Sequence, residues 1–278
     1  MRTMFTIVHL TLVEARRRRI VVAAFVVACA FLMVFGAGMF FVARALEQQQ
    51  VPLPLRQGNL ALLAIAACYA ANFLVALFAI LLPVDALSGE IDSGVIQTIA
   101  AKPVGRGAIV LGKWIGHWLV IVVYLYVTIG GVFIVSRLVS GYVPEEIGPI
   151  LLLLLLEATL LLSVSVAGGT RLSTVTNGVM ACGFYGLAFM GGWIEQVGAL
   201  AGIQSARNIG IAVSLISPAD ALWRLGSYYM QPPLARDAMQ GSPFATASVP
   251  NALMVWWAAG MTVIVLLIGV RAFSRRPL

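Results

Sequence analysis

The chain has 278 residues, of which 61% are apolar and only 10% are charged, against roughly 25% charged residues in an ordinary soluble domain. This balance excludes a water-soluble domain, which could not bury so much apolar surface, and it indicates an integral membrane protein. The net charge of +7 therefore marks the cytoplasmic face of a membrane, where basic residues meet anionic lipid, and is not a nucleic-acid footprint.

The first membrane span is predicted over residues 20–42, a stretch without a charged residue that follows four consecutive arginines at 16–19. About 20 apolar residues cross the roughly 30 Å of bilayer hydrocarbon, so this stretch is long enough. It is too long for the apolar core of a cleaved signal peptide, and the arginines lie too far from the N-terminus.

Five further apolar segments have the length of a span, at 60–84, 108–135, 149–168, 176–199 and 251–270. With the N-terminus in the cytoplasm, twelve of the 18 lysines and arginines fall in cytoplasmic segments and the other six in outer segments. The positive-inside rule then places both termini in the cytoplasm. We expect an all-α polytopic membrane protein, a single transmembrane domain over 1–278, in a bacterial or archaeal plasma membrane.

The segment between the second and third spans, 85–107, carries an amphipathic pattern. Apolar residues recur there at every fourth position and so lie along one side of a helix: Leu87, Ile91, Val95 and Ile99. Pro103 ends the pattern, which predicts a short helix over residues 87–101 with an acidic N-terminal part. The pattern alone leaves open whether this helix only rests its apolar side on lipid or contacts a partner.

Residues 107–113, GAIVLGK, have the G-x-x-x-x-G-K spacing of a phosphate-binding loop. Trp114 follows in place of Ser or Thr, and the lysine opens a membrane span, so we exclude an ATP site here. Gly112 and Gly116 instead predict a stripe of small residues on which another helix packs closely. Lys113 is expected to extend toward the cytoplasmic headgroups.

Glu157 stands in a run of leucines inside the fourth predicted span. A charged residue at mid-membrane costs roughly 2.5–3.5 kcal/mol on insertion scales. Two interpretations are open, a residue of a translocation path or a neutral carboxyl that hydrogen-bonds to a neighbouring helix. Arg171 and Asn177, after that span, form either a minor partner contact or ordinary solvated loop polarity.

The segment 200–250 is predicted to be an outer loop, part of it an amphipathic helix at the membrane interface. It either caps the translocation path and meets an outer partner or is an interface anchor with a loose tail. The three cysteines fall inside predicted spans and are interpreted as packing residues. The histidines stand alone, and no set of residues has the spacing of metal ligands, so we expect no metal and no bound cofactor in this chain.

Residues 88–116, SGEIDSGVIQTIAAKPVGRGAIVLGKWIG, resemble the signature of ABC-2-type transporter permeases, which lies between the second and third spans of that family. The matching residues are Ser88, Gly89, Glu90, Gly94, Val95, Ile96, Ile99, Pro103, Arg106, Gly112 and Lys113. The chain departs at Ile91, where the family often has Arg, and at Ala101, where it often has Leu or Ala. Residues 1–19 resemble the family's elbow helix along the inner leaflet, and 215–229 resemble the segment between its last two spans.

The resemblance implies the permease subunit of an ABC exporter, in which two permease halves pair, here as a homodimer, and each docks a separate cytoplasmic ATPase. ATP and Mg²⁺ would be bound by those two ATPase copies. Helix 87–101 would be the coupling helix. The implied coupling residues are Leu87, Ser88, Gly89, Glu90, Ile91, Gly94, Val95, Ile99, Pro103 and Arg106.

Two other classes remain open at this point. An intramembrane enzyme acting on lipid or peptide would need polar residues that converge at one depth, and the sequence shows isolated ones. An ATPase-independent channel or structural membrane protein would need no partner. The transported substrate is not encoded in any pattern of the chain.

Overall fold

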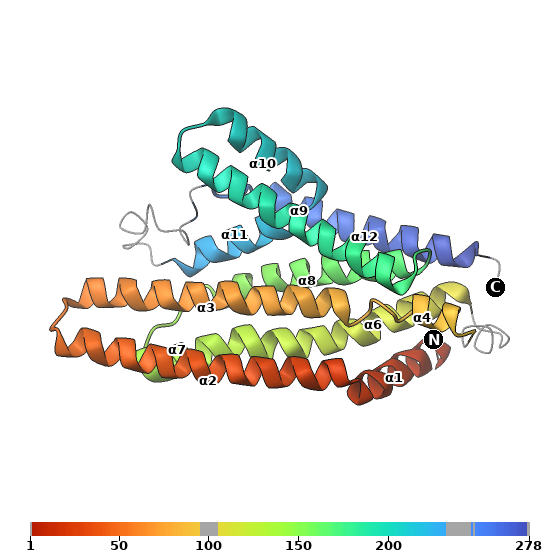
Figure 1. The fold of residues 1–278 in the computed structure, drawn as a ribbon, viewed down its shortest axis with the longest axis horizontal. Coiled ribbons are helices and arrows are strands. Elements are labelled where there is room, and N and C mark those ends of the chain that lie inside the picture. The colour runs from red at the N-terminus through yellow and green to blue at the C-terminus, as the bar shows by residue number, and fades with distance from the viewer. Residues whose placement is uncertain (1, 95–104, 232–245, 247, 277–278) are drawn as a thin grey trace.

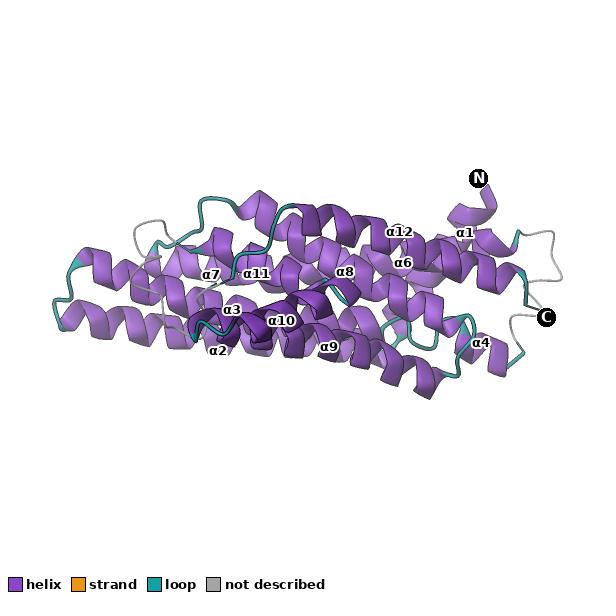
Figure 2. Cartoon of the chain, turned by 90° about the horizontal axis from the view of Figure 1, so that it is seen from above, coloured by secondary structure: helices purple, strands orange, loops and turns teal. Residues whose placement is uncertain are grey.

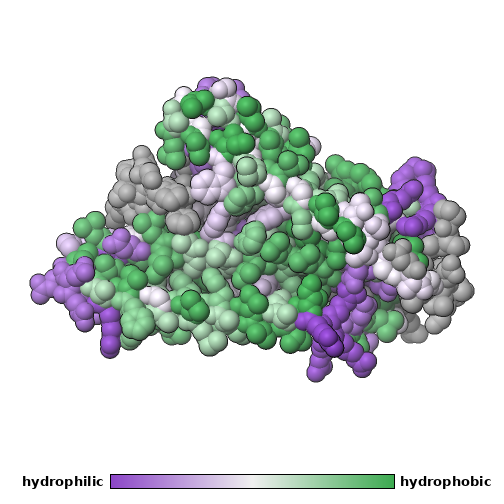
Figure 3. All heavy atoms as spheres, viewed as in Figure 1, coloured by the Kyte–Doolittle hydropathy of each residue, from purple (hydrophilic) through white to green (hydrophobic). Residues whose placement is uncertain are grey.

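The computed structural model describes residues 2–94, 105–231, 246 and 248–276, and the regular structure in these ranges is helical (Figure 1, Figure 2). Long helices lie side by side in an elongated bundle, and the two chain ends lie at the same end of it. On the face seen in Figure 3, apolar residues cover most of the length of the bundle, and strongly hydrophilic residues gather toward its two ends. This distribution fits a protein that crosses a membrane along its long axis.

Five helical segments are long and apolar enough to cross a membrane, within the described ranges. They are α2 (Arg19–Gln48), α3 (Leu53–Leu81), the composite helix Arg106–Ser140, α8 (Ile147–Gly169) and α12 (Leu253–Ser274). These segments coincide with the spans predicted at 20–42, 60–84, 108–135, 149–168 and 251–270. The all-helical membrane fold predicted from composition is confirmed.

The N-terminal helix α1 (Arg2–Arg17) precedes the first span and is separate from it. At Arg18 the backbone is extended, with φ −75° and ψ 126°, so the chain turns between α1 and α2. We call the junction of residues 16–19 the elbow corner. Helix α1, which precedes this corner, packs mainly against the third span and not against α2.

The third span is not a regular α-helix throughout. It consists of α6 (Arg106–Leu125), a π-helical turn η1 (Tyr126–Gly130) and α7 (Gly131–Ser140). The Thr128 hydroxyl donates to the carbonyl of Tyr124 at 2.7 Å inside this region. Such wide turns add one residue to a helix and recur at functional positions in proteins.

The predicted span 176–199 corresponds to α9 (Thr174–Leu200), which is long enough to cross a bilayer. It holds six glycines and two buried polar residues, Asn177 and Glu195. For this reason it is not among the described helices that are both long enough and apolar enough to cross a membrane. Its place as a membrane span therefore stays a prediction. In Figure 1 it runs obliquely across the bundle.

The segment predicted to be an outer loop holds two helices, α10 (Gln204–Ile216) and α11 (Ala219–Met230). They meet at an angle of 109° and together are apolar enough for a broken span or a re-entrant loop. Helix α10 folds back along α9, and α11 packs against α8 and α9. Most of α11 is buried, so this segment is more than an interface anchor.

The core of the bundle lies around α3 and α8. In their most apolar windows 56% and 67% of the residues are buried, against 17% in both α2 and α12. Helices α2 and α12 therefore lie on the outside of the chain, with their apolar side chains available to lipid or to another protein. Polar groups on α3 and α8 can only be satisfied inside the bundle.

Candidate functional site

The segment that follows α3 begins with one short helix, α4 (Ser88–Asp92), at the end of the bundle that holds both termini (Figure 1). The helix predicted over 87–101 is not continuous, because α4 ends at Asp92, and positions 95–101 of that prediction lie outside the described residues. The helix ends there because Ser93 caps it and Gly94 adopts a left-handed φ of +74°, which glycine reaches without a steric penalty.

The predicted coupling residues divide at this point. Leu87, which is buried, precedes α4, and four others lie within the helix: Ser88, Gly89, Glu90 and Ile91. Arg106 is the first residue of α6. Val95, Ile99 and Pro103 lie outside the described residues.

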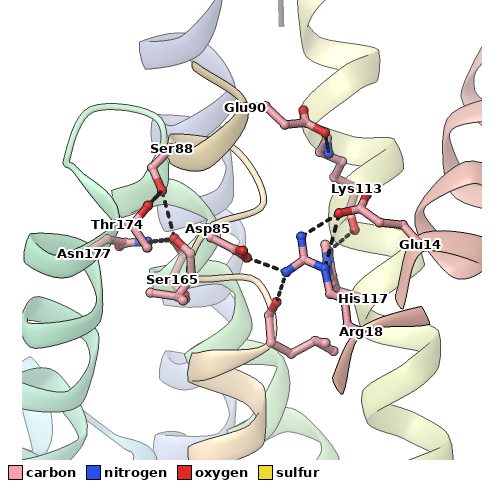
Figure 4. Close-up of polar contacts among 12 residues, drawn as sticks. Glu14, Arg18, Asp85, Ser88, Glu90, Lys113, His117, Ser165, Thr174 and Asn177 are labelled. Carbon is pink, nitrogen blue, oxygen red and sulfur yellow. Dashed lines mark hydrogen bonds and ion pairs between the residues drawn. The ribbon is translucent and has the colours of Figure 1, made fainter. Parts of the chain in front are cut away.

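Glu90 is bound to the third span by an ion pair. The Lys113 ammonium donates to Glu90 Oε1 at 2.6 Å (Figure 4), and Lys113 is only 4% exposed. The expectation that Lys113 extends toward the headgroups is therefore wrong, because a carboxylate within reach holds the ammonium inside the protein. Lys113 lies on a helix, and its carbonyl accepts a bond from His117 Nδ1 at 2.8 Å. The other oxygen of Glu90, Oε2, is buried without a partner among the described residues.

The start of α4 is bound to α9. The hydroxyls of Ser88 and Thr174 lie 2.8 Å apart, and Ser88 also donates to the carbonyl of Val84 at 3.0 Å. Asn177, one turn further along α9, donates to the carbonyls of Val84 at 3.0 Å and Ser165 at 2.9 Å. Asn177 is fully buried, so the interpretation of this residue as solvated loop polarity is wrong. These bonds join the end of α3 to α8 and α9.

The elbow corner reaches the same segment through Arg18. Its guanidinium donates to Glu14 on α1 at 2.5 Å, to Asp85 between α3 and α4, and to the carbonyl of Leu82 at 3.4 Å. Figure 4 shows Arg18 lying between the two carboxylates. One side chain thus ties the first two helices of the chain to the segment after α3.

Arg106, the first residue of α6, is bonded to the end of the C-terminal helix α12. Its guanidinium donates to the carbonyls of Arg276 at 2.5 Å and Ser274 at 3.3 Å. Arg276 in turn donates to the carbonyl of Thr170, at the end of α8, at 2.7 Å. These contacts join the start of α6 to the end of α12 and the residues that follow it.

The small residues of the third span face α1. A Cβ added to Gly112 would lie 2.7 Å from Ile7, and one added to Gly116 would lie 2.7 Å from Thr11. Separations under 3.0 Å are sterically forbidden, so α1 reaches this position only because glycine occupies both sites. The N-terminal helix therefore rests directly on the helix that follows the segment 85–105.

The contacts together form what we call the bracket, in which residues 84–90 are bonded to the elbow corner, to α6 and to α9. The bracket is made by Glu14, Arg18, Val84, Asp85, Ser88, Glu90, Lys113, Thr174 and Asn177. A force applied to this segment would act on the elbow corner, α6 and α9 at once. The arrangement is suited to transmitting movement between these elements.

Glu157 is fully buried in α8 and is bonded across to α3. The Asn72 amide nitrogen lies 3.1 Å from both carboxyl oxygens. Of the two interpretations open from the sequence, the structure contains the hydrogen bond to a neighbouring helix. Glu157 also lines a small cavity that it shares with Asp220 of α11 and with aromatic residues of α3, α9 and α11.

A second buried polar cluster, which the sequence did not indicate as a site, lies where α9, α10 and α11 meet. Arg224 of α11 is 3% exposed and donates to Asp220 and to Glu195 of α9, each at 2.8 Å. Ser248 donates to Glu195 at 2.6 Å, and Arg224 also reaches Ser214 of α10 at 3.3 Å. Arg224 therefore joins α9, α10 and α11.

One signal in the sequence indicated half of this cluster. Asp220 and Arg224 stand four residues apart in a mostly apolar segment, the spacing of a helical ion pair. The third member, Glu195, lies 29 residues before Arg224 and could not be assigned without the fold. Because Arg224 lies in a segment predicted to be an outer loop, the charge pattern did not indicate that its side chain is buried.

Comparison with known proteins gives three matches. The sequence pattern of the family described as ABC-2 family transporter protein matches residues 5–278. A probable ABC transporter permease protein NosY of Stutzerimonas stutzeri is 38% identical over 72 residues, which is 26% of each chain. The protein of the same name from Pseudomonas aeruginosa is 35% identical over 82 residues, 30% of this chain and 29% of that protein. The matched stretches thus span less than a third of these relatives.

Proposed function

The chain belongs to the ABC-2 family of transporter proteins, and we propose that it forms the translocation path of an ABC exporter driven by a separate cytoplasmic ATPase. Two copies of the permease would pair, and each would bind one ATPase copy, which would hold the ATP and Mg²⁺. The proposed location is the inner membrane of a bacterium or archaeon, with both termini in the cytoplasm. The bracket is the observation that carries the proposal.

The bracket supports this role because a coupling element must be rigid where it meets the membrane domain. Residues 84–90 are tied to the elbow corner, α6 and α9 by side-chain bonds, two of them ion pairs. A loop without these bonds would absorb a push from a partner instead of passing it to the spans. The same end of the bundle carries the excess of basic residues that marks the cytoplasmic face.

We expect the triple substitution Glu90→Gln/Gly94→Ala/Ile99→Ser to reduce co-purification of the cognate cytoplasmic ATPase by about tenfold or more. The substitutions remove a charge, a left-handed glycine and an apolar side chain from the proposed docking segment. Pull-down of the tagged permease from detergent extracts measures the effect, and thermal unfolding reports on the spans.

The matched control is Glu145→Gln/Gly141→Ala/Val143→Ser, in the loop between α7 and α8. This loop lies at the other end of the bundle, and Gly141 also has a positive φ, +72°. Equal ATPase recovery with wild type, with the proposed docking variant and with the control would contradict the proposed docking site.

The position of Glu157 beside a cavity in the centre of the bundle makes it the proposed residue of the translocation path. We expect Glu157→Gln to lose most of the ability to restore the phenotype of a strain lacking this gene. The substitution keeps the size of the side chain and removes its acid. The exposed Glu145→Gln serves as control, and full restoration by Glu157→Gln would leave Glu157 with a structural role only.

A further inference from the structure

The four consecutive arginines of the elbow corner are not equivalent in the structure. Arg18 turns inward to Glu14 and Asp85. Arg16, Arg17 and Arg19 are exposed, and their side chains have no ion pair or hydrogen bond within the described part of the chain. Three unneutralised guanidinium groups therefore stand together on the surface at the turn between two helices.

Apolar side chains lie on the same side of α1 as two of these arginines. Phe5, Leu10 and Val13 are 72%, 60% and 40% exposed. By the helical repeat, Val13 lies on the face that leads to Arg16 and Arg17, three and four residues later. The opposite face, with Ile7 and Thr11, packs on α6. Helix α1 thus presents exposed apolar side chains, interspersed with the exposed Thr6 and His9, on a face that ends in free positive charge.

The apolar surface continues past the corner into the first span. Ile20, Val22 and Val26 of α2 are exposed. In Figure 3 strongly hydrophilic atoms gather beneath the junction of α1 and α2, directly beside the apolar surface of the bundle. A lipid has this pair of properties in complementary form, with an anionic phosphate beside apolar chains.

We propose that the elbow corner is a binding site for anionic phospholipid, in which Arg16, Arg17 and Arg19 bind the headgroup phosphate. Phe5, Leu10 and Val13 then lie against the acyl chains. Guanidinium groups suit this role because they bind phosphate through paired N–H donors. The bound lipid fixes the corner from outside, and Arg18 transfers that constraint to Asp85 of the bracket.

The test uses the full chain in neutral detergent with an equimolar mixture of phosphatidylglycerol and phosphatidylcholine. Native mass spectrometry counts the molecules of each lipid that stay bound. For Arg16→Gln/Arg17→Gln/Arg19→Gln we expect the preference for phosphatidylglycerol to fall at least tenfold, since each basic residue near an anionic surface contributes about fivefold. Arg16→Lys/Arg17→Lys/Arg19→Lys should retain most of the preference.

The control Arg44→Gln/Arg56→Gln/Arg137→Gln removes equal charge from the opposite end of the bundle and should leave the preference unchanged. An equal fall in both triple variants, or none in the first, overturns the proposal. Displacement of the lipid by inorganic phosphate, where sodium chloride of equal ionic strength does not displace it, also overturns the proposal, because the site would then recognise free phosphate. If the first variant does not assemble, the same lipid preference is measured on the wild-type chain at low and at high salt. The proposal expects the preference to weaken at high salt, and a preference that persists there is not electrostatic and overturns the proposal.

Discussion

Arg224→Leu is expected to lower the free energy of unfolding by about 3–5 kcal/mol, the usual cost of removing one partner from a buried ion pair. The leucine would leave Glu195 and Asp220 facing each other across a buried site without the guanidinium that both contact at 2.8 Å. The contacts that Arg224 makes to Ser214 and to the carbonyl of Ser248 would be lost as well. The measurement is the midpoint of thermal unfolding of the purified protein.

Neutralising the cluster as a whole should restore most of the loss. In Arg224→Leu/Glu195→Gln/Asp220→Asn no carboxylate remains unpaired, and such replacements in other proteins are often neutral or stabilising. The exposed Arg137→Leu on α7 controls for the loss of a charge. A triple variant as unstable as the single one would show that the cluster matters through its shape and not through its charge balance.

Gly192→Ala is expected to destabilise the same region by an amount at or above the upper end of the about 1–3 kcal/mol typical of overpacking. A Cβ at Gly192 would lie 1.6 Å from Asp220 Oδ2. That oxygen cannot move aside freely because it accepts the bond from Arg224. Helices α9 and α11 would have to separate, and thermal unfolding measures the result.

Gly183→Ala is the matched control, on the same helix with the same added methyl group. Nothing lies within 4 Å of a Cβ at Gly183, so we expect little change or a slight gain from the higher helix propensity of alanine. Equal melting of the two variants would contradict the close approach of α11 to α9.

The spans could be predicted from the sequence because the bilayer imposes a minimum length and forbids charge over that length. Residues 20–42 and 60–84 satisfy both conditions in the sequence alone, and the structure places α2 and α3 there. Local signals of this kind survive because they depend on solvent and not on which helices are neighbours. The elbow helix, in contrast, was expected over residues 1–19 only from the resemblance to the ABC-2 family.

The coupling segment and the helices α10 and α11 were harder to predict, because their structure depends on residues that lie far away in the sequence or on a single glycine. A spacing of four among Leu87, Ile91 and Val95 outweighed Gly94, although a glycine after a short polar stretch also ends helices. In 200–250 the signals were mixed, because α11 carries charges that are satisfied only by residues far away in sequence. The Arg18 bonds to Asp85 join positions 67 residues apart, which no local pattern reveals.

The π-helical turn at Tyr126–Gly130 also determines what the third span presents on either side of it. One inserted residue rotates everything downstream by about 100° around the helix axis, since an α-helix has about 3.6 residues in each turn. Before the turn the span packs mainly against α1, α8 and α12, after it mainly against α2, and α3 contacts both parts. The wide turn thus rotates the second part of the third span about the helix axis, so that one continuous helix contacts two sets of neighbours. Shortening the turn by one residue would point Val132, Phe133 and Ser136 away from the helices that they now face.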